Sequence, residues 1–205
     1  QKRVVHGIIL GQDNQKMSKS RGNTINPDEM IEQFGADTLR AYIMFIGPYD
    51  QEAAWNMGGI QGVYRFLKRV WTNYEKVNNK EDRHELLVKL HQTIVSVTHD
   101  LETFQFNTVV SALMELNNVI EKVGSISKQS YQTFLKLLFP VCPHIADELW
   151  QKIGANDATE DQEWPKQEEK YLIANIITIA VQINGKIRGT IEISPSASKD
   201  EAKKT

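Results

Sequence analysis

Residues 16–20 read Lys-Met-Ser-Lys-Ser, a short basic stretch that separates two different kinds of sequence. Upstream, residues 4–10 (Val-Val-His-Gly-Ile-Ile-Leu) are largely apolar, and four turn-forming or polar residues follow them. Downstream, Asn26-Pro27 and the two acids after it are typical of a helix start, because they supply an N-cap, a proline at the first helical position and a negative first turn. The pattern predicts a loop between a strand and a helix.

The two lysines of this loop suggest a chemistry. A lysine ammonium is a compact point charge on a flexible stem and binds phosphate in that form. A loop with two such groups can reach over a triphosphate and neutralise the charge that develops on a leaving pyrophosphate. The alternative is an ordinary solvated basic loop, because short basic motifs are common.

The composition is that of a soluble globular protein of one or two domains, with 205 residues of which 40% are hydrophobic and 24% charged. The net charge of -2 gives no general basic field, so any nucleic-acid contact must come from local patches. The single Cys142 excludes an intramolecular disulfide, and with His144 it offers too few ligands for a metal site. Without a membrane-length apolar run or a signal peptide, we expect a cytoplasmic protein with no membrane contact.

From residue 27 onward the apolar residues recur at spacings of three and four, which is typical of helices that bury one face. Glycines and prolines mark several of the boundaries. The predicted helices cover 27–34, 37–45, 57–77, 83–102, 107–123, 127–139 and 144–153.

Two polar groups on these helices have open interpretations. Arg65, Lys68 and Arg69 lie on the long helix 57–77 with no acid between residues 64 and 74, which fits either a solvated surface or a contact with an RNA backbone. Asp37 and Arg40 could be catalytic by residue type. We interpret both as structural, because an acid in a first helical turn with a partner three residues on is ordinary.

Near the end of the chain the hydrophobic period changes to that of strands. Residues 177–183 and 186–193 are predicted strands, joined by Asn-Gly, the strongest sequence signal for a type I′ hairpin turn. Lys186 and Arg188 are expected on one face of the second strand. The predicted fold is therefore mainly α (α+β overall): a strand–loop–helix segment, a helical bundle and a C-terminal β-hairpin.

Residues 16–20 spell the KMSKS signature of class I aminoacyl-tRNA synthetases, and Gly-Ala-Asp-Thr-Leu-Arg at 35–40 fits the same context. Residues 139–150 closely resemble the helical anticodon-binding domain of this class. Residues 181–189 resemble the first hairpin of the leucyl-type C-terminal domain. From the loop onward, the chain resembles the leucyl-tRNA synthetases of bacterial type.

The resemblance implies an enzyme that couples leucine to ATP, accompanied by Mg²⁺, and transfers the leucyl group to tRNA(Leu). Residues 16–20 would bind ATP, with Lys16 and Lys19 as the catalytic residues and Lys19 as the transition-state contact. Met17 would pack the closed loop, while Ser18 and Ser20 would supply hydroxyl donors. The implied tRNA contacts are Arg65, Lys68, Arg69, Lys186 and Arg188.

By the same resemblance, four parts are expected. They are the end of a catalytic domain with stem-contact helices (1–48), a helical anticodon-binding domain (49–153), a linker (154–170) and the start of a C-terminal tRNA-binding domain (171–205). The His-x-Gly-His element that class I synthetases use beside the loop is missing. We therefore expect a piece of a longer, monomeric enzyme that is inactive by itself and binds neither ATP nor Mg²⁺.

Two alternatives stay open. A sister synthetase, methionyl, isoleucyl or valyl, would share the signature loop, but the motif at 35–40 and the hairpin residues at 184–189 argue against it. A non-catalytic helical RNA-binding module with a degenerate loop is the other alternative. The intact Lys16 and Lys19 argue against that module.

Overall fold

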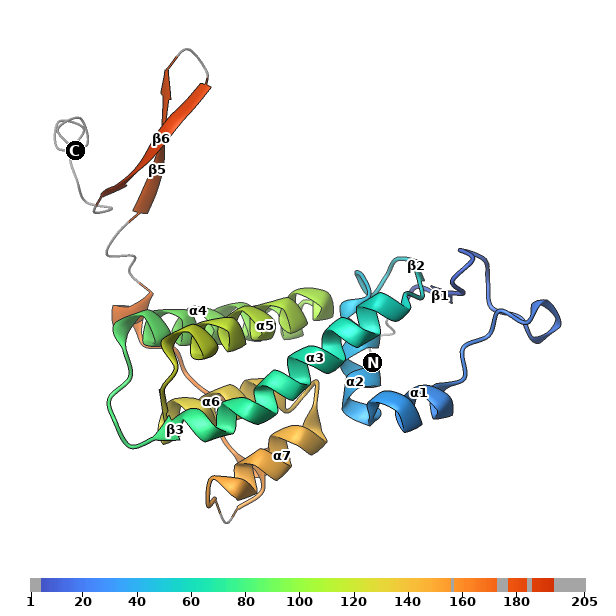
Figure 1. The fold of residues 1–205 in the computed structure, drawn as a ribbon, viewed down its shortest axis with the longest axis horizontal. Coiled ribbons are helices and arrows are strands. Elements are labelled where there is room, and N and C mark those ends of the chain that lie inside the picture. Colours follow the sequence, from blue (N-terminus) through green and yellow to red (C-terminus); the bar gives the residue numbers. More distant parts are fainter. Residues whose placement is uncertain (1–4, 156, 173–176, 184–185, 194–205) are drawn as a thin grey trace. The chain divides into compact units, whose positions relative to one another are not determined.

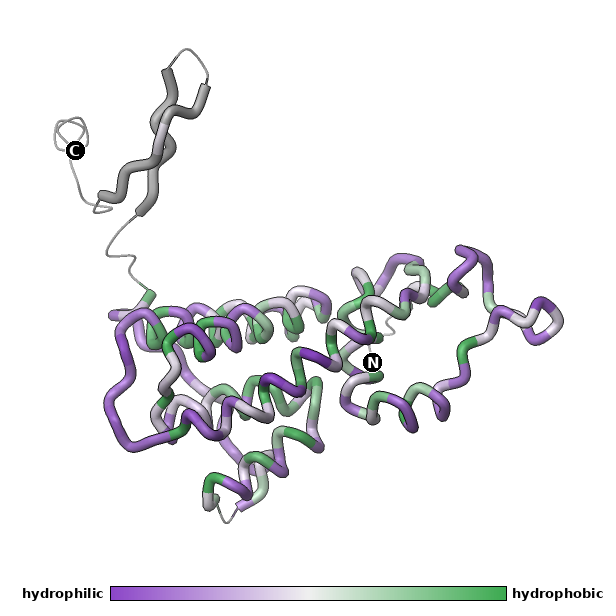
Figure 2. Tube along the Cα trace, viewed as in Figure 1, coloured by the Kyte–Doolittle hydropathy of each residue, from purple (hydrophilic) through white to green (hydrophobic). Residues whose placement is uncertain are grey.

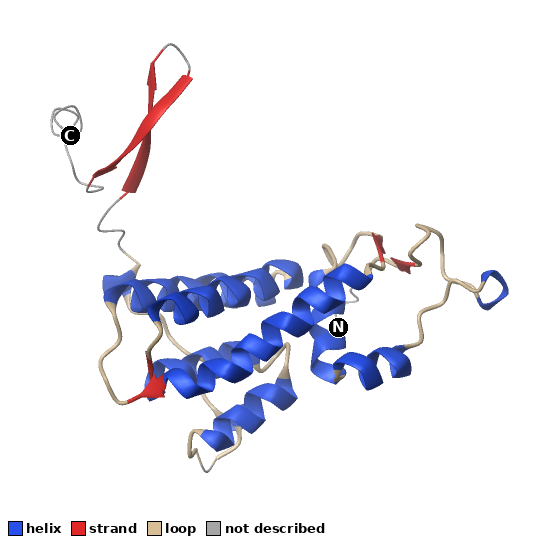
Figure 3. Cartoon of the chain, viewed as in Figure 1, coloured by secondary structure: helices blue, strands red, loops and turns tan. Residues whose placement is uncertain are grey.

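The computed structural model describes residues 5–155, 157–172, 177–183 and 186–193, and the chain divides into two compact units (Figure 1). Unit 1 is Gln1–Gln167 and unit 2 is Glu168–Thr205. The described part of unit 1 is mainly helical, with loops and four short strands between the helices, whereas that of unit 2 is dominated by a β-hairpin (Figure 3). The predicted fold class is confirmed.

The helices of unit 1 lie where the sequence predicts them, each within one residue of its expected ends, except for the third. Their bounds are α1 (Pro27–Phe34), α2 (Ala36–Phe45), α3 (Met57–Asn73), α4 (His84–Glu102), α5 (Phe106–Val123), α6 (Lys128–Leu138) and α7 (Pro143–Lys152). The helix predicted to reach residue 77 ends at Asn73, because a 3-10 turn (Tyr74–Lys76) leads the chain into a short strand. In the part of the chain that the structure describes, no helix is long and apolar enough to span a membrane.

Polar side chains fix several helix starts, and glycines fix two of the ends. Asn26, Asn56 and Ser127 each accept a hydrogen bond from a backbone N–H in the first turn of α1, α3 and α6, which satisfies donors that the helix leaves free. Gly35 and Gly124 follow α1 and α5 with φ of 88° and 73°. A side chain would strain the backbone there, so these glycines allow the chain to reverse.

One continuous hydrophobic core holds unit 1 together. α4 and α5 lie side by side as a helical hairpin, and α2, α3, α6 and α7 complete the bundle (Figure 1). The hydrophobic residues gather on the sides of the helices that face one another (Figure 2). Ile60, Val63, Leu113, Leu116 and Phe134 are fully buried at its centre.

Two short parallel strand pairs fasten the connections between helices. β1 (Ile9–Leu10) pairs with β2 (Ala53–Ala54), which ties the base of the N-terminal loop to the segment before α3. β3 (Val77–Asn78) pairs with β4 (Ile126–Ser127) and joins the connections that precede α4 and α6. Beyond β1, the loop that leads to α1 extends away from the helices (Figure 1).

The predicted linker, 154–170, is in contact with the helices as far as Trp164. The Trp164 Nε1–H donates to Oγ1 of Thr98 in α4 at 2.7 Å, and Thr159 Oγ1 donates to Oδ1 of Asp147 in α7 at 3.1 Å. These contacts place the division between the units near the end of the expected linker. The four domain boundaries themselves stay predictions.

Unit 2 contains the predicted antiparallel hairpin of β5 (Ile177–Ile183) and β6 (Lys186–Ile193). The register shifts by one residue between Val181 and Gln182, so the pairing skips Arg188 as in a β-bulge. Because the side chains of Lys186 and Arg188 lie outside the described part of the structure, their placement on one face stays a prediction. The Asn-Gly turn lies outside the described residues.

Candidate functional site

The loop that carries the basic signature is closed at its base by an acid and an amide. Asn23 Nδ2 donates to both carboxylate oxygens of Asp13 at 3.1 and 3.0 Å, and Asn23 Oδ1 accepts from the backbone N–H of Ser18 at 2.8 Å. The carboxylate also accepts from the Gln15 N–H at 3.1 Å. Residues 16–20 are therefore held between two partners that are ten positions apart in the sequence.

The charge of Asp13 stabilises this closure. The backbone N–H of Gln15 is the main cause that holds the pKa of Asp13 below its usual value, and the Asn23 amide and the Arg21 charge act in the same direction. Hydrogen bonds donated to a carboxylate favour its ionised form. The ionised carboxylate is thus the form that orders the loop.

The signature side chains lie on this closed loop. Lys16 and Lys19 are exposed, and neither ammonium group forms an ion pair with any residue that the structure describes. Met17 is partly buried and packs against the core, while the hydroxyl oxygens of Ser18 and Ser20 are 2.8 Å apart. Such a loop offers two strong donors for phosphate oxygens without first breaking an internal ion pair.

The closure of the loop is a feature that we did not predict from the sequence. Asp13 and Asn23 are both common turn residues, and the sequence pattern indicates only a turn at Asp13. A signal for the pairing lies in the glycines beside them. Gly11 is buried against both partners, and Gly22 adopts φ 67° just before Asn23.

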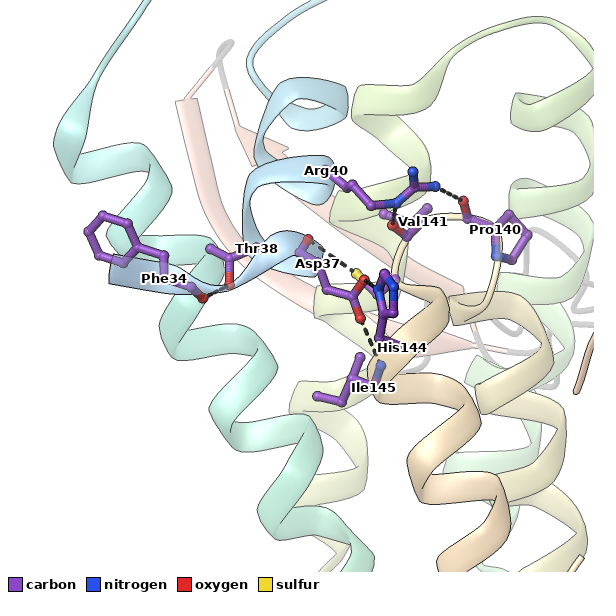
Figure 4. Close-up of polar contacts among 9 residues, drawn as sticks. Phe34, Asp37, Thr38, Arg40, Pro140, Val141, His144 and Ile145 are labelled. Carbon is purple, nitrogen blue, oxygen red and sulfur yellow. Dashed lines mark hydrogen bonds and ion pairs between the residues drawn. The ribbon is translucent and has the colours of Figure 1, made fainter. Parts of the chain in front are cut away.

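A second group of polar contacts joins α2 to the start of α7 (Figure 4). Asp37, which is buried, has its Oδ1 2.7 Å from Nδ1 of His144, and its Oδ2 accepts the backbone N–H of Ile145 at 2.7 Å. A carboxylate at this position also complements the positive end of the α7 dipole. The Cys142 thiol, next to this contact, is buried, and burial raises its pKa, so the thiol stays neutral.

Arg40 links α2 to the connection between α6 and α7. Its Nε and Nη2 donate, each at 3.4 Å, to the carbonyl oxygens of Val141 and Pro140, just after α6 ends (Figure 4). Asp37 and Arg40 are structural, as expected, but their partners are the ends of α7 and α6. The expected pairing of an acid with a residue three positions on does not describe these contacts.

The three cations predicted to contact tRNA on α3 have different surroundings. Arg69 Nη1 donates to Oε2 of Glu121 in α5 at 2.8 Å, so its charge is neutralised within the bundle. Arg65 is exposed, and Lys68 is exposed with Nζ 4.8 Å from the centre of the Tyr64 ring. The charge imbalance of α3 is therefore smaller than its own sequence indicates, because α5 supplies an acid.

The remaining two predicted tRNA contacts, Lys186 and Arg188, lie on β6. The structure describes the backbone there but not the side chains. Their role stays a prediction.

The matches to family models define the class of this chain. Residues 83–203 match the anticodon-binding domain of tRNA ligase, and residues 1–56 match the tRNA synthetases class I (I, L, M and V). The chain therefore belongs to the class I tRNA synthetases that carry this anticodon-binding domain.

Within this class, the relatives are leucine–tRNA ligases. The chain is 45% identical over 204 residues to that of Alkaliphilus oremlandii and 43% identical over 202 residues to that of Chlorobaculum tepidum, alignments that cover 99% and 95% of it. The chain spans about a quarter of the length of these relatives. The resemblance to leucyl-tRNA synthetases is confirmed, and the sister synthetases are not favoured.

Solved structures agree with this placement. The ternary complex of the Agrobacterium radiobacter K84 LeuRS with tRNA and LeuAMS superposes with a TM-score of 0.80 and 28% identity over 97% of this chain and 28% of that chain. The Mycobacterium tuberculosis methionyl-tRNA synthetase with methionyl-adenylate has a TM-score of 0.56 and 19% identity over 73% of this chain and 38% of that chain. The second similarity shows a shared fold only.

Proposed function

We propose that this chain works as part of a leucine–tRNA ligase, which activates leucine with ATP and transfers it to tRNA(Leu). The observation that carries the proposal is the intact signature loop, in which Lys16 and Lys19 are exposed and the base is closed by Asp13 and Asn23. The homology to leucine–tRNA ligases over nearly the whole chain supports the choice of leucine.

In the proposed reaction the leucine carboxylate attacks the α-phosphorus of ATP, and pyrophosphate leaves. Lys19 donates to the phosphate oxygens on which negative charge accumulates, and Lys16 holds the triphosphate in place. Donors that are positioned before the reaction stabilise such charge without reorganising. Met17 anchors the loop to the core, and the Ser18 and Ser20 hydroxyls are further donors to ATP.

In this proposal Mg²⁺ binds to the phosphates of ATP, which is how proteins commonly hold this ion. Among the residues that the structure describes, no three or more His, Cys, Asp or Glu side chains are grouped so as to hold a metal ion. The described residues thus do not fit a protein-held metal site. No step of the proposed reaction is assigned to Mg²⁺.

The helical bundle is proposed to bind tRNA(Leu). Arg65 and Lys68 are exposed on α3 and available for phosphate contacts, while Arg69 contributes mainly by its position against α5. Lys186 and Arg188 of β6 are proposed as further contacts. The match to the anticodon-binding domain of tRNA ligase supports tRNA as the partner.

Amino-acid-dependent exchange of pyrophosphate into ATP by the full-length enzyme tests the activity. We expect exchange with leucine and much weaker exchange with methionine, isoleucine or valine at equal concentration. Exchange that prefers one of those three would replace leucine in the proposal, and no exchange with any amino acid would refute the activity. A monomeric state in the cytoplasm is a further prediction, and gel filtration of the full-length enzyme tests the monomer.

A further inference from the structure

Trp71 borders a groove that is also lined by Lys68, one of the proposed tRNA contacts. The groove has a volume of about 440 Å³ and lies among α1, the start of α2, α3 and α7. Its apolar lining includes Phe34, Tyr64, Leu67, Trp71 and Ile145. We call it the Trp71 groove. Its volume falls within the range of about 300–1,000 Å³ that is usual for small-ligand sites.

The aromatic rings of this region are accompanied by lysines. Trp71 is 42% exposed, and Nζ of Lys152 in α7 lies 5.2 Å from its ring centre and 5.6 Å from that of Tyr74. Lys152 and Tyr74 line a neighbouring groove, and Lys152 is near the Trp71 groove through its contact with the Trp71 ring. Lys68, which lines the groove from the same helix α3 as Trp71, lies over the Tyr64 ring at 4.8 Å from its centre.

Acids oppose this positive charge only in part. Asp37 lines the groove but is already engaged by His144 and the N–H of Ile145. Glu148 is exposed on the rim. Two ammonium groups beside aromatic rings, of which the Trp71 ring is exposed and the tyrosine rings are half-buried, resemble the surfaces that bind single-stranded nucleic acid, where aromatic side chains stack on bases and cations follow the backbone. A protein segment in the groove would need its apolar lining but not these lysines.

We propose that an unpaired nucleotide of the tRNA binds in the Trp71 groove. Its base stacks on Trp71, and the adjoining phosphates lie near Lys68 and Lys152. The proposal rests on the proposed function, which supplies the RNA, and adds a contact to a base where only contacts to the backbone were predicted. Stacking tolerates any base, so this contact adds affinity without reading sequence.

Tryptophan fluorescence of the 205-residue chain tests the stacking directly, because a stacked base quenches an indole. Trp55 and Trp150 are buried at 5% and 2% exposure, which leaves Trp71 and Trp164 as the exposed indoles. Trp164→Phe removes the second of these. We expect a tRNA(Leu) transcript to quench Trp164→Phe and to leave Trp71→Phe essentially unquenched. No quenching of Trp164→Phe, or equal quenching of both variants, would overturn the proposal.

Affinity for the same transcript gives an independent readout. Trp71→Ala should weaken binding between about fivefold and a hundredfold, which is the usual effect of removing a stacking platform, and Trp71→Phe should weaken it less because a ring remains. Lys68→Ala should also weaken binding, whereas its matched control Lys80→Ala, at an exposed lysine of the connection before α4, should bind as the parent does. Unchanged affinity in Trp71→Ala would leave the groove for another occupant and refute the proposal.

These outcomes are separable from the proposed function. Leucine-dependent pyrophosphate exchange needs no tRNA, so a failure at Trp71 with normal exchange in the full-length enzyme refutes only the groove. Absence of leucine-dependent exchange in the unmutated full-length enzyme would refute the proposed function itself.

Discussion

Asp37 in α2 and His144 in α7, 107 positions apart in the sequence, meet with Oδ1 and Nδ1 at 2.7 Å. The same carboxylate accepts the N–H of Ile145, and Arg40, one turn further along α2, donates to the carbonyls after α6. α2 is therefore hydrogen-bonded both to the start of α7 and to the connection between α6 and α7. α1 and the signature loop come before α2 in the sequence. These hydrogen bonds of α2 therefore help to position the segment that carries the loop against the rest of the bundle.

Replacing this carboxylate should destabilise the chain. Asp37→Ala removes a helix-capping acceptor that is almost fully buried, and we expect the free energy of unfolding to fall by about 1–2 kcal/mol. His144→Ala is the control: its side chain is 73% exposed, so the loss should stay below about 1 kcal/mol. Chemical denaturation measures both. An equal effect of the two substitutions would show that the imidazole, and not the helix start, is the important partner.

The closure of the loop should depend on pH through Asp13. Its pKa is lowered in the folded chain, so the closure is complete above the unfolded-state pKa of about 4 and is lost as the pH falls through the lower folded-state value. The Gln15 amide proton, which bonds to this carboxylate, should report the change by NMR at pH below about 4. In Asp13→Asn the amide signal should not titrate there. A titration that persists in this variant would assign the change to another group.

Two glycines of α3 should respond to alanine in opposite directions. At Gly59 a Cβ would lie 2.7 Å from Cε2 of the buried Tyr42, and the ring is held by its hydroxyl, which accepts the Asn56 N–H at 2.8 Å. Gly59→Ala should therefore cost about 1–3 kcal/mol. At Gly62 the nearest atom is 3.9 Å away, and alanine should add about 0.5–1 kcal/mol through helix propensity. Thermal unfolding of both variants distinguishes these effects, and a stabilised Gly59→Ala would contradict the close approach of α3 to Tyr42.

Arg65 and Arg69 of α3 should differ in how much they contribute to tRNA binding. Arg65→Ala is expected to lower the slope of log affinity against log salt by about one, as for the loss of one phosphate contact. Arg69→Ala should change this slope less, because its guanidinium is paired with Glu121, and should cost less than about 1 kcal/mol of stability. Binding titrations at several salt concentrations give both slopes. A larger change for Arg69 than for Arg65 would mean that RNA displaces Glu121.

Local patterns predict the fold of this chain well. The spacing of apolar residues and the caps at Asn26, Asn56 and Ser127 place the helices to within one residue at most ends. The error at the end of α3 has a tertiary cause, because β3 pairs with β4 and turns the chain out of the helix. No pattern within 57–77 carries that information.

The contacts of the candidate site are less predictable, because they join distant parts of the sequence. Residue type alone could suggest that Asp37 was structural, but not that it caps α7. Arg69 and Glu121 are 52 positions apart in the sequence. Their pairing shows that the positive charge of α3 is smaller than the sequence of that helix alone indicates. The signature loop was predicted from its lysines, whereas its closure by Asp13 and Asn23 depends on geometry that turn residues do not specify.

The central claim is that Lys19 stabilises the charge on the leaving pyrophosphate, and leucine-dependent pyrophosphate exchange in the full-length ligase measures it. Lys19→Ala should lower kcat of the exchange about 100- to 1,000-fold, as when one preorganised donor is removed, while tRNA affinity changes little. Lys80→Ala, an exposed lysine outside the loop, should exchange as the parent does. Equal exchange rates in Lys19→Ala and the parent would contradict the role of Lys19 and return the loop to an ordinary solvated surface.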